Sequence, residues 1–320
     1  MIAYAAAMIG LMIWQILFAS VPALMRLSEF HSDVVYSLVS QIVCMGILPL
    51  VVLLALGGSN AKDSFRTMRY KPPRDGKSCL LICLGLMLLI TPFTMAFNAL
   101  TSLIFTVFGY KRAYGVGMIY LGAGDLFAMF AITAILPAIF EEFTHRGLLL
   151  SGLEYRGSER TAILLSAVLF GLMHTNPAQM IYATFGGILF AYVVIKTDSI
   201  IPAMCAHFAN NAISVLLDYS SQTQNALGVW YDRMTGTSLL NVGVTFAVLA
   251  LSLFGVVRLM QYAARKSPKP VSEGKLFGLV TVDLYNPEGK PTLKDNAVLY
   301  AVMVSESALL VGLFLWGILK

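Results

Sequence analysis

One apolar segment of this chain carries charges where a membrane helix rarely tolerates them. No charged residue occurs between Asp125 and Glu141, and then Glu142 and Arg146 follow within two helical turns. A charged side chain near the centre of a bilayer costs roughly 2.5 kcal/mol or more, so such residues usually have a function. The segment 125–150 therefore predicts a membrane helix that carries part of a functional site.

The composition predicts an all-α polytopic membrane protein. Of the 320 residues, 58% are hydrophobic and 12% are charged, whereas soluble domains have about 25% charged residues. A membrane span needs about 20 mostly apolar residues. Nine segments are candidates: 2–24, 34–56, 80–100, 126–150, 162–174 (a short one), 180–195, 200–217, 239–260 and 297–319. We expect a bundle of eight to nine transmembrane helices, formed as one membrane domain over 1–320, with an intramembrane catalytic site.

The basic residues predict how the chain is oriented. With the N-terminus inside, 16 of the 22 Lys and Arg residues fall in inner loops and 5 in outer loops, while Arg146 lies within a span. This bias follows the positive-inside rule and predicts a multi-pass integral membrane protein with a cytoplasmic N-terminus. The net charge of +5 does not indicate a nucleic-acid partner, because the basic residues belong to these loops. The basic loops are expected to contact membrane lipids, which are the partners that this charge predicts.

The longest polar stretch, 267–296, is expected to form a cytoplasmic loop. Residues 276–284 have the β-branched and apolar character of a strand, and 285–291 contain turn residues. A small hairpin and a flexible linker are the two alternatives for this loop.

Helical periodicity gives the two glutamates different neighbours. Residues four apart share a helix face, so Glu142 can form an ion pair with Arg146. Glu141 points elsewhere and lacks this cation, which suits a general base. Pro137 cannot donate a hydrogen bond to the carbonyl of Thr133, so we expect the helix to bend just before the carboxylates.

Two later apolar segments each carry one histidine. Phe170 and His174 are one helical turn apart, and so are His207 and Asn211. A lone histidine in a membrane helix is usually a packed residue, but two of them together with the acidic helix favour a common site. We expect the three helices to converge.

Together these residues resemble the CAAX prenyl protease and bacteriocin-processing family. Its members are intramembrane glutamate-dependent endopeptidases, related to the type II CAAX prenyl endopeptidase. The motifs that carry the resemblance are Glu141-Glu142-x-x-x-Arg146, Phe170-x-x-x-His174 and His207-x-x-x-Asn211, in this order on three apolar helices. They lie within 125–217, which is the expected catalytic core.

The resemblance implies a role for each motif residue. Glu141 would activate a water molecule, and His174 would help to hold it. His207 and Asn211 would stabilise the oxyanion of the tetrahedral intermediate, while the second glutamate and the arginine of the first motif would organise the site. The substrate would be a peptide or protein at the inner leaflet, with or without a lipid anchor. CAAX cleavage and bacterial peptide processing both stay open.

One position departs from the family, and it leaves a metal alternative open. His145 stands where an apolar residue is frequent, on the face of Glu141, where it could tune the base or contact the substrate. No cofactor is expected, but Glu141, His174 and His207 could hold zinc with an open fourth position. Glu142-x-x-His145 is a ligand pair of di-iron bundles, yet the sequence has no second pair of this kind. The four cysteines form no zinc pattern.

Two functions from other classes stay open beside the endopeptidase. The first is a non-catalytic membrane scaffold or bacteriocin-immunity protein on the same fold. The second is a proton-coupled transporter, since intramembrane Glu and His also form proton relays. Glu306, a further carboxylate in the last candidate span, has no assigned role.

Overall fold

The computed structural model describes most of the chain, chiefly as long helices. The described residues are 1–57, 65–73, 75–107, 122–174, 176–235, 238–267, 274–276, 280–282, 300–302, 304–308 and 311. The α-helices are α1 (Ile2–Ser20), α2 (Pro22–Met25), α3 (Glu29–Leu38), α4 (Leu48–Gly57), α6 (Gly76–Val107), α7 (Ala123–Met129), α8 (Leu136–Glu142), α9 (Ser151–Arg156), α10 (Glu159–Leu172), α11 (Pro177–Thr197), α12 (Ile201–Gln222), α13 (Ala226–Met234) and α14 (Leu239–Arg265). Within the described residues, three π-helical segments join some of these helices end to end: η1 (Val39–Ile47), η3 (Phe130–Ile135) and η4 (Phe143–Leu150).

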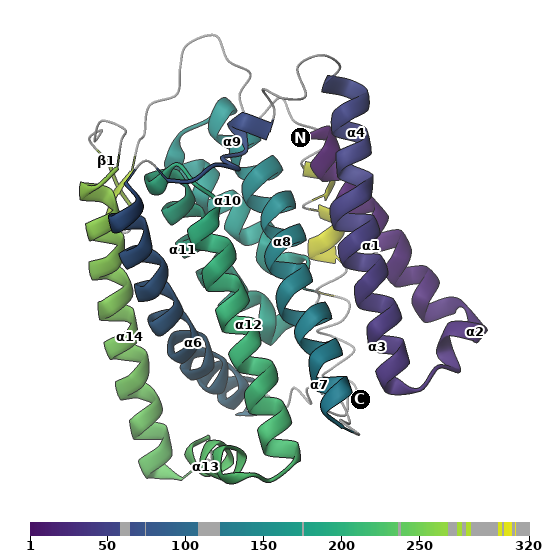
Figure 1. Cartoon of the computed structure of the whole chain (residues 1–320), viewed down its shortest axis with the longest axis vertical. Helices are drawn as coiled ribbons and strands as arrows, with labels where there is room; N and C mark the ends of the chain where they lie inside the picture. The colour runs from purple at the N-terminus through teal and green to yellow at the C-terminus, as the bar shows by residue number, and fades with distance from the viewer. Residues whose placement is uncertain are drawn as a thin grey trace.

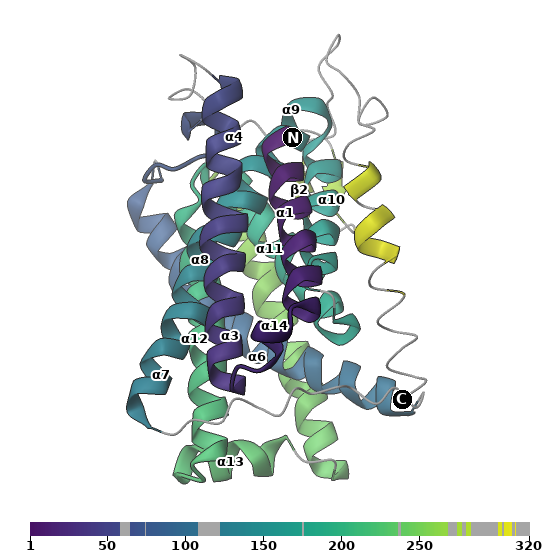
Figure 2. The same ribbon diagram turned by 90° about the vertical axis from the view of Figure 1, so that its right-hand side faces the viewer.

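Successive long helices run in alternating directions and form a bundle (Figure 1). α1 descends from the end that carries the N-terminus, and the continuous helix α3–η1–α4 returns beside it (Figure 2). The chain then descends through α6, rises through α7 to η4, and continues in the same alternation through α10, α11, α12 and α14. The short helix α13 lies across the opposite end, between α12 and α14 (Figure 1).

The structure confirms an all-α polytopic membrane protein. Among the described residues, six helices are long and apolar enough to cross a membrane: Ile2–Ser20, Phe30–Leu56, Gly76–Thr101, Gly124–Tyr155, Gln179–Thr197 and Leu239–Arg265. Large apolar side chains lie exposed on their flanks, for example Leu88 at 74%, Phe127 at 73% and Leu239 at 89%. Exposed apolar surface on this scale suits contact with lipid rather than water.

Three further candidate spans differ from the six in length or polarity. The 14 residues of α10 are too few to cross a bilayer alone, whereas α12 has 22 residues and a more polar composition. Both helices nevertheless pack inside the bundle, α10 against α11 and α12 against α6. The last candidate, 297–319, is helical where it is described, and its other residues lie outside the described part.

The helix that carries the glutamates changes its winding twice. The π-helical segments η3 and η4 stand on either side of α8, and Pro137 is the second residue of α8. α8 also approaches η1 closely, because a Cβ atom at Gly46 would lie 2.7 Å from the ring of Phe140. The hydroxyl of Thr144 donates to the carbonyl of Met45 at 2.7 Å. The close contact therefore holds the acidic helix against η1.

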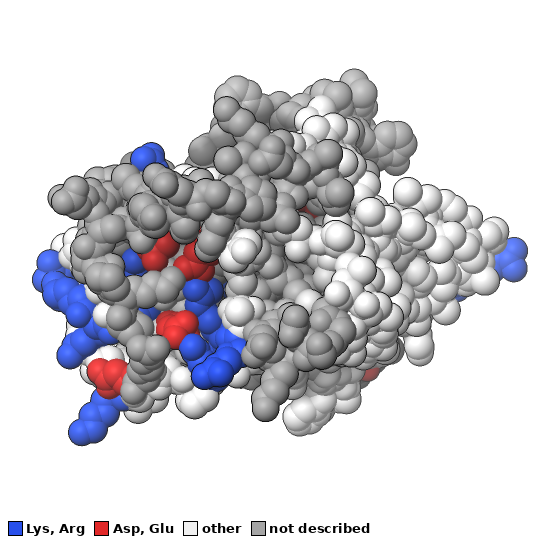
Figure 3. Space-filling view, turned by 90° about the horizontal axis from the view of Figure 1, so that it is seen from above, with Lys and Arg blue, Asp and Glu red and all other residues white. Residues whose placement is uncertain are grey.

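Many of the described Lys and Arg side chains gather at the end of the bundle that carries the N-terminus. Viewed from this end, Lys and Arg side chains cluster on the side of α6 and α14, with Asp and Glu among them (Figure 3). A two-stranded antiparallel sheet lies at the same end, made of β1 (Gly274–Leu276) and β2 (Val280–Val282) (Figure 1). The strand expected over 276–284 is thus divided between two strands. The turn expected at 285–291 lies outside the described residues.

Candidate active site

Glu141 is buried at the end of α8 and faces a cavity. Its side chain is 7% exposed, and its Oε1 accepts a hydrogen bond of 2.7 Å from Gln41 Nε2 of η1. His207 also lies close to this carboxylate, with its Nε2 3.9 Å from Oε2. Gln41 therefore fixes one oxygen of this carboxylate and leaves the other toward His207.

Glu142 points away from the cavity and binds two basic side chains. Its Oε1 accepts a hydrogen bond from Arg146 at 3.0 Å, which forms the ion pair expected from the sequence. The same oxygen lies 2.8 Å from His207 Nδ1. Because a carboxylate accepts hydrogen bonds, Nδ1 of His207 carries the proton of this contact. Glu142 thus orients the imidazole so that its Nε2 faces Glu141.

His174 is oriented by the backbone of its own helix. Its Nδ1 lies 2.7 Å from the carbonyl oxygen of Phe170. A carbonyl only accepts hydrogen bonds, so Nδ1 is the donor and Nε2 is left with its lone pair. His174 lines the same cavity as Glu141 and His207.

The ring of Phe170 lies at the centre of the basic residues. It makes edge contacts with three histidine rings, at centroid distances of 5.1 Å to His145, 5.0 Å to His174 and 5.9 Å to His207. The guanidinium carbon of Arg146 lies 4.1 Å from its centroid, within the range of a cation–π interaction. Phe170 thereby separates the buried cation from the cavity and holds the rings apart.

Asn211 is tied to the backbone of η3, just before the helix that carries the carboxylates. Its Nδ2 donates to the carbonyl of Thr133 at 2.9 Å, and this is the carbonyl to which Pro137 cannot donate. Asn210 donates in turn to Asn211 Oδ1 at 3.2 Å. Helix α12 therefore holds the acidic helix at η3, and Asn211 lies at the cavity wall with a second amide hydrogen.

His145 lies behind Glu141, away from the cavity. Its Nδ1 is 3.2 Å from the backbone carbonyl of Glu141, and its ring meets the edge of Tyr4 from α1 at a centroid distance of 5.5 Å. The residue is fully buried and is not part of the cavity wall. Its position suits support of the helix more than contact with substrate.

The site contains polar residues that the sequence motifs do not include. Gln41 comes from η1, and Thr94 of α6 donates to Asn210 Oδ1 at 2.6 Å. Both lie more than 40 positions from the nearest motif residue in the sequence. Only the occurrence of an amide or hydroxyl within an apolar span could have marked them.

One comparison with known proteins bears on the same residues. Residues 123–213 match the Rce1-like family of type II CAAX prenyl endopeptidases. This confirms the resemblance expected from the motifs, over less than a third of the chain. Neither a curated protein nor a solved structure matches the chain.

The Rce1-like segment holds all eight residues singled out from the sequence, from Glu141 to Asn211. The structure brings seven of them into one connected cluster around Phe170 and the two carboxylates, with Asn211 beside it. In the described part of the chain, no three His, Cys, Asp or Glu side chains are arranged to hold a metal ion. The described residues bring a carboxylate, two oriented imidazoles and an amide to this cavity.

Proposed function

We propose that the protein is an intramembrane endopeptidase that hydrolyses peptide bonds with a water molecule activated by Glu141 and His174. One observation carries this proposal: Glu141 shares a cavity wall with His174 and His207 and is bonded to an amide, not to Arg146. A carboxylate in this position can accept a proton from water, as a general base requires. The match to the Rce1-like family supports the same reaction class.

The proposed reaction begins with attack of water on the carbonyl carbon of the scissile bond. The water oxygen bonds to that carbon as Glu141 takes its proton, and His174 Nε2 accepts the second hydrogen bond of the water. The tetrahedral intermediate then collapses, the C–N bond breaks, and Glu141 returns the proton to the leaving nitrogen. The products are a carboxylate and an amine, so no other reactant is needed.

His207 and Asn211 are proposed to stabilise the oxyanion. Nδ1 of His207 already donates to Glu142, so its Nε2 can donate only when both ring nitrogens are protonated. The loss of one oxyanion donor typically lowers the rate about 10²- to 10³-fold.

The substrate is proposed to be a membrane-associated peptide or protein, and membrane lipids are the other partners. The N-terminus is proposed to face the cytoplasm, because the Lys and Arg residues gather at its end of the bundle (Figure 3).

Mapping of peptide ends in cells tests the proposed activity. N- and C-termini of membrane-associated peptides are compared between wild type and Glu141→Gln at equal expression. The matched control is Glu306→Gln, which alters another buried carboxylate that does not line the cavity. Specific termini should vanish with Glu141→Gln and persist with Glu306→Gln. Identical profiles in all three would favour the non-catalytic scaffold, and pH-dependent solute uptake that requires Glu141 would favour the transporter.

A further inference from the structure

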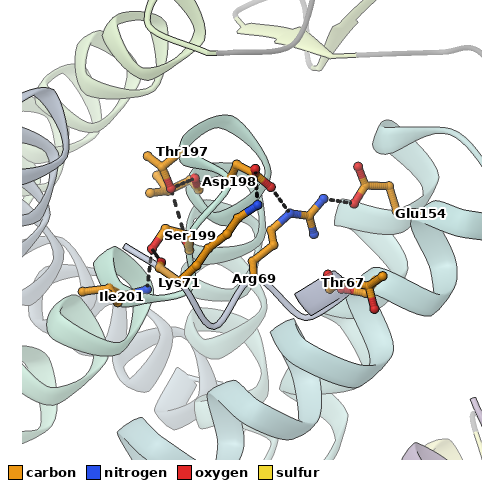
Figure 4. A network of polar contacts seen from close by, with 10 residues as sticks. Thr67, Arg69, Lys71, Glu154, Thr197, Asp198, Ser199 and Ile201 are labelled. Atoms are coloured by element: carbon orange, nitrogen blue, oxygen red, sulfur yellow. Dashed lines mark hydrogen bonds and ion pairs between the residues drawn. The ribbon is translucent and has the colours of Figure 1, made fainter. Parts of the chain in front are cut away.

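A polar network lies at the basic end of the bundle, which also carries the N-terminus (Figure 4). Asp198, in the turn between α11 and α12, accepts hydrogen bonds from Arg69 Nε at 3.2 Å and from Lys71 Nζ at 2.6 Å. Through Nη2, Arg69 also pairs with Glu154 of α9. One guanidinium therefore binds two carboxylates that are far apart in the sequence.

Arg69 is buried although it belongs to a basic loop. The charge pattern of the sequence counts it among the inner-loop cations expected to contact lipid, yet it is only 7% exposed. A buried guanidinium is costly unless its charge is paired, and its planar fork can bind two carboxylates at once. The partners of Arg69 therefore lie inside the protein.

The segment that carries Arg69, residues 67–71, lies along one face of the acidic helix. This helix continues from α8 through η4 into α9 without a break. Its contacts with the segment recur every three or four positions, as residues on one helix face do. They join Phe143 to Tyr70 (6.2 Å between ring centroids), Gly147 to Met68 (3.6 Å from a Cβ atom built on the glycine), Ser151 to the carbonyl of Thr67 (3.2 Å) and Glu154 to Arg69.

The same segment binds the start of α12. The backbone carbonyl of Arg69 accepts a hydrogen bond of 3.1 Å from the amide of Ile200, and Ser199 Oγ donates to the carbonyl of Lys71 at 2.8 Å. Farther from this end, α12 packs directly on η3 and α8. The segment therefore lies between the acidic helix and the start of α12, and the side chain of Arg69 bridges the two.

Both partners of one ion pair in this bridge have an unusual backbone conformation. Arg69 has a φ of 61° and Asp198 a φ of 52°, in the left-handed region that residues other than glycine rarely adopt. Among the described residues, Gln224 is the only other such residue. Conformations of this kind persist where the surrounding contacts over-determine them, and they cluster at functional sites.

We propose that Arg69 is a positioning residue, which joins the acidic helix to α12 at the basic end and thereby sets how His207 meets Glu142. The inference rests on the proposed function. His207 lies seven residues beyond Ile200, about 10 Å along α12, so a shift at the start of this helix reaches it. A misplacement of about 1 Å in a catalytic group can lower a rate about 100-fold.

The kinetics of Arg69→Gly test this role. Glycine accepts the left-handed φ at position 69, so the variant removes the guanidinium without adding backbone strain. The kcat of Glu141-dependent cleavage should fall roughly 10- to 100-fold. KM should stay near the wild-type value, because Arg69 is not among the residues that line the cavity. Guanidinium ion added at millimolar concentration should restore part of kcat.

Lys196→Met is the matched control. Lys196 pairs with Glu159 at 2.6 Å and is 7% exposed, but this pair joins α11 to α10 and does not involve the acidic helix or α12. Both variants lose a buried ion pair, so both should lower Tm, whereas only Arg69→Gly should lower kcat. An equal loss of kcat in the two variants, or a wild-type kcat in Arg69→Gly, would overturn the positioning role.

Arg69→Lys covers the case in which Arg69→Gly does not fold. It keeps the positive charge, but one ammonium group does not reproduce the fork that binds Glu154 and Asp198 together. Its kcat should therefore still fall, and a wild-type kcat in Arg69→Lys would equally overturn the inference.

Spin labels measure the bridge without cleavage. Tyr155→Cys and Ile201→Cys, at positions that are 59% and 39% exposed, are labelled in a background whose four native cysteines are replaced by alanine. Double electron–electron resonance should show a shifted or broadened distance distribution in Arg69→Gly and an unchanged one in Lys196→Met. An unchanged distribution in Arg69→Gly would overturn the inference while the protease stands. A changed distribution without any Glu141-dependent cleavage would refute the proposed function, and with it the positioning role, but would confirm the bridge.

Discussion

Nδ1 of His207 lies 2.8 Å from Oε1 of Glu142, and the same oxygen accepts a hydrogen bond of 3.0 Å from Arg146. The three side chains are buried, with exposures of 5%, 0% and 1%. One carboxylate oxygen thus fixes two basic groups from two helices. Of the two adjacent glutamates, Glu142 therefore binds the basic side chains, whereas Glu141 faces the cavity.

Glu142→Gln is expected to destabilise the protein strongly. The substitution leaves the charge of Arg146 buried without its counter-ion, and breaking a buried pair in this way costs about 3–5 kcal/mol in free energy of unfolding. Denaturant unfolding of the detergent-solubilised protein measures the change. Glu141→Gln is the matched control and should cost much less, because its amide can still bond to Gln41. Equal losses in the two variants would contradict the division of roles.

Helical periodicity is sufficient to predict the pairs within each motif. Glu142 and Arg146, and likewise Phe170 and His174, are one turn apart, and both pairs are in contact in the structure. The contact between His207 and Glu142 spans 65 positions and depends on how α12 packs, so spacing alone could not predict it. The all-α membrane bundle was likewise predictable from the long apolar segments. In lipid, the backbone N–H and C=O groups of a spanning segment must form hydrogen bonds within the protein, and a helix provides them.

Other features depend on packing that no local pattern encodes. Gln41 reaches Glu141 because η1 approaches α8 closely at Gly46, and the sequence gives no sign of this contact. The short length of α10 was visible in the sequence, yet its burial inside the bundle was not.

Removal of metal ions is expected to leave cleavage unchanged. The proposed mechanism uses side chains alone, so a chelator such as EDTA should not alter the rate of Glu141-dependent cleavage in purified protein. The measurement is the cleavage rate before and after dialysis against the chelator. Loss of activity that zinc restores would instead favour the metal alternative, with Glu141, His174 and His207 as ligands.

The network at the basic end predicts a stability that is lost in acid. Burial raises the pKa of Asp198, but Lys71 and Arg69 together lower it further, so the net pKa lies below the ordinary 3.8. A depressed carboxylate pKa stabilises the fold above the ordinary value, and this contribution disappears as pH falls through the lower folded value. Unfolding midpoints of wild type and Asp198→Asn are compared between pH 7 and pH 3.

Wild type should exceed Asp198→Asn in stability at pH 7, and the difference should shrink as pH falls below about 3.9, the usual range of aspartate. Asparagine suits this control because it tolerates the positive φ of 52° that position 198 adopts. A difference that stays constant across the range would mean that the charge of Asp198 does not contribute.

Pro137→Ala is expected to reduce the rate without destabilising the fold. An alanine restores the amide that can donate to Thr133, so it competes with Asn211, whose Nδ2 now donates there at 2.9 Å. The backbone before Glu141 should then shift, and small displacements of catalytic groups lower rates by roughly 10- to 100-fold. Values of kcat and Tm for Pro137→Ala are compared with those for Pro202→Ala, at the first turn of α12, where proline displaces no helical hydrogen bond. An unchanged kcat in Pro137→Ala would show that Pro137 is not needed to place Glu141.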